Sequence, residues 1–172
     1  MAAGAAARPS RTRRRDWETT VKPAVSAQLT LMATRTKNNL TINAGPVGVN
    51  VLSAITGAAA ANGAYDSGTG VHAEIDAITN VGAANWGNAL TITTNKEPCP
   101  RCAAILQAFV ATHNWTVRAP ANAFASNYTG AYALPDNILT LVIACLQPAL
   151  QGDEATHYRS NIKSVIMGFA IS

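Results

Sequence analysis

Two short segments constrain the fold of this 172-residue chain more than any other feature. The first is Val71-His72-Ala73-Glu74, and the second is Glu97-Pro98-Cys99-Pro100-Arg101-Cys102. Zinc binds imidazole nitrogen and thiolate sulfur readily, and catalytic zinc sites use three protein ligands and keep the fourth tetrahedral position for water. We therefore predict that the fold brings both segments together around one zinc ion per chain, held by His72, Cys99 and Cys102.

The local setting of these residues favours catalytic chemistry. Two cysteines three positions apart at the start of a helix can face one metal, and the positive end of that helix favours their thiolates. Glu74 lies two residues beyond His72, so both side chains approach one pocket if His72 opens a helix. Glu74 is then expected to carry protons between water at the metal and the substrate.

Two other interpretations of these residues stay open. A Cys-x-x-Cys pair also occurs in redox proteins, but that chemistry would leave His72 and Glu74 without a role. The histidine and the two thiols could instead be core residues that never meet. Disulfide pairing is disfavoured because the chain has 3 cysteines, an odd number, and because Cys99 and Cys102 lie only three positions apart, which is a poor disulfide framework.

Hydrophobic periodicity predicts an α/β domain. The expected helices span 17–34, 71–81, 102–113 and 136–150, and the expected strands span 40–42, 47–55, 90–94, 115–118 and 165–171. The small, Gly-rich segment 58–70 is expected to be a loop. This order predicts a three-layer fold with a mixed five-stranded sheet and helices on both faces. A helix at 136–150 would make the strands on either side of it parallel neighbours.

The positive charge is concentrated near the start of the chain. The formal net charge is +4, yet Arg8, Arg11, Arg13, Arg14 and Arg15 all precede the first acid, Asp16. We predict a disordered basic tail over 1–16, which would bind phosphates without reading sequence, and a single domain over 17–172. No apolar run reaches the length of a membrane span, so no membrane partner is expected.

The motif His-x-Glu followed by Pro-Cys-x-x-Cys resembles the signature of the cytidine deaminase-like superfamily. The stretch Thr94–Ala103 is most similar to the branch that holds tRNA adenosine deaminases and deoxycytidylate deaminases. Pro46-Val47-Gly48 also resembles the start of an early strand in that branch. The resemblance implies the three-layer deaminase fold, a zinc cofactor and Glu74 as the catalytic residue.

The same resemblance suggests residues that touch the substrate. Asn62 falls about where that branch places an asparagine that contacts the ribose, although Asn-Gly is also a common turn. Ala73 and Pro98, inside the two motifs, are further candidates for substrate binding. Farther along the chain, Phe124, Tyr128 and Tyr132 either stack on a base or pin down their own loop.

The resemblance implies a hydrolytic deaminase that converts cytosine to uracil in a single-stranded or flipped-out polynucleotide, with DNA favoured over RNA. Three features favour a polymer: the basic tail, the helix expected before the last strand, and the aromatic loop. The alternatives are free cytidine or deoxycytidine nucleosides and nucleotides, adenosine in tRNA, and a catalytically silent nucleic-acid-binding zinc module. The compact form resembles bacterial toxin-type DNA cytosine deaminases, so the expected location is the cytoplasm or a target cell. Assembly into oligomers is compatible with the sequence.

Overall fold

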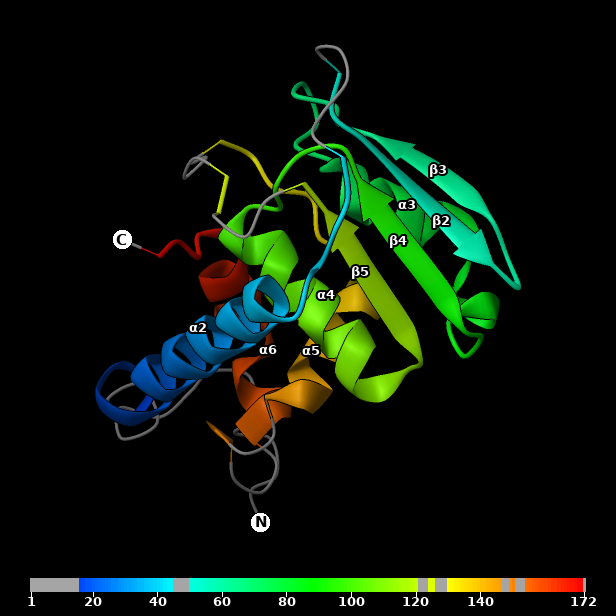
Figure 1. The fold of residues 1–172 in the computed structure, drawn as a ribbon. Helices are drawn as coiled ribbons and strands as arrows, with labels where there is room; N and C mark the ends of the chain where they lie inside the picture. The colour runs from blue at the N-terminus through cyan, green and yellow to red at the C-terminus, as the bar shows by residue number, and fades with distance from the viewer. Residues whose placement is uncertain are drawn as a thin grey trace.

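A computed structural model describes residues 16–44, 50–120, 124–125, 130–146, 149–150 and 154–171 (Figure 1). Apart from Asp16, the predicted basic tail lies outside these residues. The helices are η2 (Trp17–Val21), α2 (Lys22–Asn38), α3 (Ala73–Val81), η3 (Ala83–Asn85), α4 (Pro100–Thr112), α5 (Asp136–Cys145) and α6 (Glu154–Met167). The strands are β1 (Thr41–Ile42), β2 (Leu52–Gly57), β3 (Ala61–Ala64), β4 (Leu90–Thr94) and β5 (Trp115–Ala119). Within the described ranges, no helix is both long enough and apolar enough to span a membrane.

The strands form one mixed sheet of 5 strands in the order β1-β5-β4-β2-β3. β4 pairs in parallel with β5, and β5 in parallel with β1, whereas β2 runs antiparallel to both β3 and β4. The parallel strands β4 and β5 are joined by α4, the crossover that such a pair requires. The predicted mixed five-stranded sheet is thus confirmed.

The two faces of the sheet have different surroundings. Ile55, Ile92 and Val117 stand in register across three strands and are buried. α3 packs against β2 and β3, and α4 packs against β5. The opposite face carries Thr116 and Arg118, which are exposed. Figure 1 views the sheet from this open side, with α3 behind β2 and β4.

The remaining long helices form an outer layer around α4. α2 and α5 pack on α4, and α6 contacts both α2 and α5 (Figure 1). In the part of the chain that the structure describes, the layers are therefore the sheet, the pair α3 and α4, and the outer helices. The expected helix layer on the second face of the sheet is not found among these residues.

The N-terminal helical segment is longer than predicted. It runs through η2 and α2 to Asn38, with Val25, Leu29 and Met32 buried. Pro23, which has no backbone N–H to donate, lies in the first turn of α2, directly after the π-helical turn η2. The predicted strand 47–55 corresponds to β2, but residues 45–49 lie outside the described ranges.

The prediction of a loop over 58–70 is wrong, because β3 lies within it. Composition pointed away from a strand, since small and glycine residues weaken strands in general. Here the glycine has a packing role. A Cβ atom on Gly63 would lie 2.3 Å from both the carbonyl oxygen of Ala73 and the backbone nitrogen of Ala77. Only glycine allows β3 to approach α3 so closely.

The prediction of a buried strand over 165–171 is also wrong. α6 continues to Met167, and its buried residues Tyr158, Ile162 and Ile166 recur every four positions, as on one side of a helix. β3 supplies the fifth strand instead. Consequently, the helix at 136–145 does not precede a final strand, and the edge position beside β5 is taken by β1.

Candidate active site

The site forms where α3 and α4 begin. His72 is the N-cap residue of α3 and Cys99 is the N-cap residue of α4, both with extended backbone conformation. The backbone N–H of Cys102 donates to Sγ of Cys99 over 3.4 Å, so this sulfur caps its own helix. Pro100 fits the first turn, where no N–H donor is needed. These local rules place the two positive helix ends near the same sulfur and imidazole groups.

The three predicted ligands converge. One nitrogen of His72 and the sulfurs of Cys99 and Cys102 all lie within 4.8 Å of one another, and all three residues are buried. Sγ of Cys99 is 3.6 Å from Nδ1 of His72, and both cysteines are free thiols rather than a disulfide. Zinc–ligand distances of about 2.0–2.3 Å give similar separations between tetrahedral ligands. The donor set and its spacing therefore fit one zinc ion.

Glu74 brings a carboxylate to the same place. Its side chain is 5% exposed and, together with His72, Ala73 and Cys99, it lines a cavity of about 320 Å³. Burial raises the pKa of Glu74 to about 7, and the neighbouring Cys99 adds to this shift. A carboxyl group with this pKa can both accept and release a proton near neutral pH.

The two thiols are electrostatically different. The pKa of Cys99 is held well below its usual value, chiefly by a hydrogen bond from the Cys102 side chain and also by His72. Burial, followed by the interaction with Cys99, raises the pKa of Cys102 well above its usual value. A bound dication would favour the thiolate form of both residues.

The other predicted contact residues do not all reach this cavity. Ala73 lines it, whereas Pro98 is buried nearby and its carbonyl oxygen accepts the N–H of Ala125 over 3.2 Å. Asn62 lies on β3, and its carbonyl oxygen accepts a hydrogen bond from Asn80. It lines a separate hollow of about 790 Å³ on the open side of the sheet. The structure thus does not bring Asn62 to the metal ligands.

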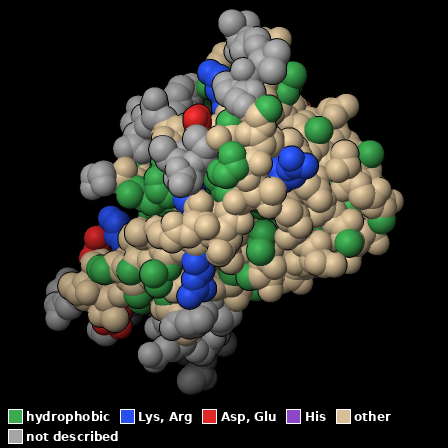
Figure 2. Space-filling model, viewed as in Figure 1, with side chains coloured by type: hydrophobic (Ala, Val, Ile, Leu, Met, Phe, Trp, Pro, Cys, Tyr) green, Lys and Arg blue, Asp and Glu red, His purple; other side chains and the backbone are tan. Residues whose placement is uncertain are grey.

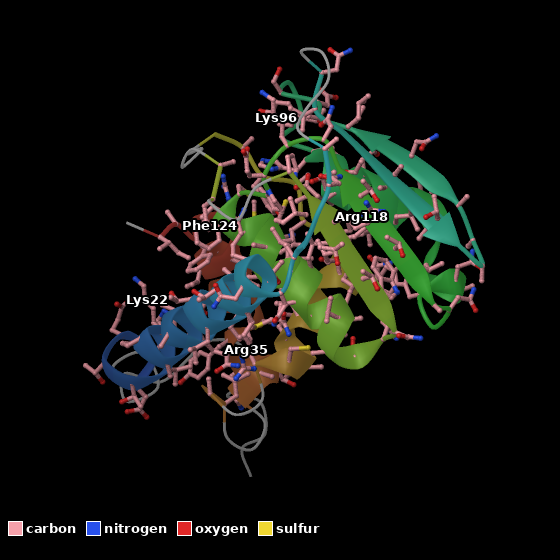
Figure 3. All side chains as sticks on the ribbon, in the orientation of Figure 1. Lys22, Arg35, Lys96, Arg118 and Phe124 are labelled. Atoms are coloured by element: carbon pink, nitrogen blue, oxygen red, sulfur yellow. The ribbon has the colours of Figure 1, made fainter. Side chains whose placement is uncertain are left out.

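Sequence reasoning missed several residues that complete the cavity. Its lining also contains Val51, Tyr65, Lys96, Glu97 and Ala125. The exposed Lys96 lies beyond the end of β4, as Figure 3 shows. Lys96 and Glu97 lie in or beside the second motif, but no local pattern marks Val51, Tyr65 or Ala125, which only the folded chain brings to the cavity.

Lys37 is a buried cation near the site that was also missed. Its Nζ lies 5.0 Å from the centre of the Phe124 ring, a cation–π contact. Burial lowers the pKa of Lys37 to about 8, although Glu97 and Glu74 oppose this shift. Nearby, the Thr36 hydroxyl donates to the carbonyl oxygen of Ala103 over 2.7 Å and anchors the end of α2 on α4.

The aromatic residues that were candidates either for stacking on a base or for pinning down their loop do not line the cavity where the structure describes them. Tyr132 is 2% exposed, and its ring centre lies 4.6 Å from that of His72. Phe124 is half-buried beneath Lys37, and Tyr128 lies outside the described residues. The centre of the Tyr65 ring lies 5.3 Å from that of His72, in an edge-on arrangement. Tyr132 therefore packs on a predicted metal ligand instead of projecting toward a base.

A family model described as the cytidine and deoxycytidylate deaminase zinc-binding region matches residues 23–117. This match covers more than half of the chain and includes both motifs. The chain belongs to this deaminase family. A search of curated proteins and a search of solved structures found no match.

Membership confirms two of the predictions made above. The deaminase has the α/β fold of the cytidine deaminase-like superfamily, and its cofactor is one zinc ion, for which the cluster of His72, Cys99 and Cys102 offers a fitting donor set. The protein is accordingly a zinc-dependent hydrolytic deaminase.

Proposed function

We propose that this deaminase converts cytosine to uracil in single-stranded DNA. The observation that carries the proposal is the buried carboxylate of Glu74, which shares a cavity of about 320 Å³ with the metal ligands His72 and Cys99. A cavity of this size lies at the small end of ligand sites and suits one flat base rather than a larger molecule. The family model supports cytosine as that base, because its description names cytidine and deoxycytidylate.

The reaction adds water to C4 of cytosine and releases ammonia. When bound at His72, Cys99 and Cys102, zinc would supply Lewis-acid chemistry and lower the pKa of water at the site to near neutrality. Glu74 accepts a proton from the attacking water and transfers it to N3 of the ring. It then takes the proton of the new hydroxyl group at C4 and delivers it to the amino group as the C4–N4 bond breaks, so that uracil and ammonia are the products. The pKa of Glu74, raised by burial to about 7, allows its carboxyl group both to accept and to release a proton near neutral pH.

A phosphate-bearing substrate is supported by charge at the cavity. Lys96 is exposed in its lining and can pair with a phosphate beside the inserted base. The helix expected before a last strand no longer supports a polymer, because α6 takes the place of that strand. Tyr132 of the aromatic loop does not support one either, because it is buried. The arginine-rich tail remains a reason from sequence. We favour a polymer over a free nucleotide because the tail and Lys96 together offer several cations to a chain of phosphates.

The proposal is tested by incubating the purified protein with single-stranded DNA, duplex DNA, tRNA, cytidine and deoxycytidylate in parallel. Mass spectrometry then quantifies deaminated products. Uracil formed mainly in single-stranded DNA is the expected result. Activity on cytidine or deoxycytidylate alone would show a free-nucleotide enzyme, and inosine in tRNA would show an adenosine deaminase.

Glu74→Gln tests the assigned proton carrier. This variant is expected to keep its zinc and to lose about 10²–10⁴-fold in kcat, the usual contribution of general acid–base catalysis. Glu18→Gln makes the same chemical change at an exposed position on η2 and serves as the control. Equal turnover by Glu74→Gln and wild type would refute the role. Zinc binding by a wild type that is inactive on every substrate would favour the silent zinc module.

A further inference from the structure

Tyr132 contacts two of the three metal ligands, although it lies far from both motifs in sequence. Its hydroxyl oxygen is 3.0 Å from Sγ of Cys102, and its ring packs at 4.6 Å from the ring of His72, tilted by 57°. Tyr132 is 2% exposed, so its hydroxyl group is removed from solvent. A buried phenol in this position needs a hydrogen-bond partner, and the sulfur supplies it.

The backbone around Tyr132 is held in place from one side by Gly70. The N–H of Ala133 donates to the carbonyl oxygen of Gly70 over 2.9 Å. Gly70 has a φ of +75°, and a Cβ atom there would lie 2.3 Å from the carbonyl oxygen of Ala131. Since Gly70 lies just before His72, the segment that carries Tyr132 is fastened to the chain that carries the histidine ligand.

The ring of Tyr132 is held from a second side by Arg101. The guanidinium carbon lies 4.6 Å from the ring centre, a cation–π contact. Arg101 is 3% exposed and donates to the carbonyl oxygen of Met167 at the end of α6 over 2.7 Å. Arg101 also directly precedes Cys102. The tyrosine is thus fixed between α6, α4 and the segment before α3.

From this geometry we propose that Tyr132 is a positioning residue of the zinc site, which donates its phenol hydrogen to the Cys102 sulfur and orients His72 through its ring. The inference concerns the metal site alone and does not depend on which base or polymer is the substrate. Neither motif of the chain contains this residue, and the sequence offered only two roles for it, stacking on a base or pinning down its own loop.

The direction of the hydrogen bond follows from the chemistry of the two groups. A metal-bound cysteine is a thiolate, which has no proton to give, whereas the phenol has one O–H donor. Donation to the sulfur withdraws electron density from it and fixes the direction of its lone pairs. Outer partners of this kind orient the ligands, and their loss typically weakens metal binding by about 10–100-fold.

Tyr132→Phe is the direct test because it deletes one oxygen atom and keeps the ring. Zinc affinity, measured by competition with a chromophoric chelator, is expected to fall about 10–100-fold. Tyr158→Phe is the matched control, since Tyr158 is also buried but packs against Trp17 with ring centres 5.2 Å apart. The control should bind zinc like wild type. Equal zinc affinity for Tyr132→Phe and wild type would overturn the proposal.

A spectroscopic readout separates positioning from general loss of structure. With Co²⁺ in place of zinc, loss of the hydrogen bond should shift the thiolate-to-cobalt charge-transfer band of Tyr132→Phe but not that of Tyr158→Phe. If Tyr132→Phe does not fold, 3-fluorotyrosine at position 132 preserves the shape and makes the hydroxyl a stronger donor. Its band should move in the opposite direction to that expected for loss of the bond. An unmoved band with 3-fluorotyrosine would overturn the proposal.

Discussion

The two faces of the sheet differ in what they can do chemically. The covered face meets α3 and α4, whose N-cap residues His72 and Cys99 line a cavity of about 320 Å³. The open face has a larger hollow of about 790 Å³. That hollow is lined by strand and loop residues, with Arg118 as its charged group. Figure 2 shows mostly uncharged surface on the sheet half of the molecule.

This contrast shows that the size of a hollow does not locate the chemistry. Helix starts concentrate unpaired N–H groups and positive potential at one place, and two of them converge on the covered face. Side chains of a strand alternate and spread along the face, so they do not converge on one atom. The contrast between the two faces can be tested by removing the metal and by substitutions at Gly63, Lys96 and Asn62.

Removal of zinc should have the largest effect. A strong chelator is expected to abolish deamination and to lower the melting temperature, because binding to the folded state alone stabilises it. Added Zn²⁺ should restore both, whereas Mg²⁺ should restore neither, since it prefers oxygen ligands. Deamination by metal-free protein would show that the reaction does not depend on the metal site at the covered face.

Gly63→Ala should destabilise the fold by about 1–3 kcal/mol, the range found for overpacked sites. The new methyl group would meet backbone atoms of Ala73 and Ala77, which cannot move without shifting α3. Chemical denaturation measures this change. Gly87→Ala is the control, because a Cβ atom there has nothing within 4 Å. Equal stability of both variants would show that β3 and α3 are not closely packed.

Lys96→Gln should have a smaller effect, confined to charged substrates. We expect kcat/KM on single-stranded DNA to fall about 2–5-fold at low salt, the loss typical of one exposed charge pair. High salt should reduce the difference. Arg118→Gln makes a comparable change on the open face and should leave kcat/KM unaltered. A larger loss with Arg118→Gln would show that the nucleic acid crosses the open face instead.

Asn62→Ala should have the smallest effect. Because Asn62 is exposed on the side away from the metal ligands, kcat/KM should stay within about 2-fold of wild type, as for most surface substitutions. Steady-state kinetics on the preferred substrate checks this. A loss above tenfold would restore the ribose-contacting role that the sequence suggested and would place substrate on both faces.

The active site was largely predictable from sequence because its geometry is local. His72 and Cys99 are N-cap residues, and Cys102 follows Cys99 at helical spacing, so each motif folds into its ligand arrangement independently. The motif spacing then made convergence on zinc a specific hypothesis. Tyr132 could not be found in this way, since only the tertiary fold brings it to Cys102.

The fold was predicted less completely in two places. β3 was missed because Gly63 serves a close approach to α3, which no pattern within residues 58–70 reveals. The strand expected at 165–171 was wrong because part of a helical repeat was taken for a short apolar strand. Val165, Ile166 and Met167 look like a strand in isolation, but the buried positions Tyr158 and Ile162 upstream continue a four-residue spacing into Ile166.

The position of β1 has a consequence for how the protein is made. Thr41 and Ile42 pair in parallel with Arg118 and Ala119, and the N–H of Asn43 donates to the carbonyl oxygen of Ala119. During synthesis, the segment that follows α2 therefore has no partner until β5 leaves the ribosome. Such distant pairing slows folding and prolongs exposure of an unpaired strand edge. The nascent chain thus completes this border of its sheet only after most of the deaminase core has been translated.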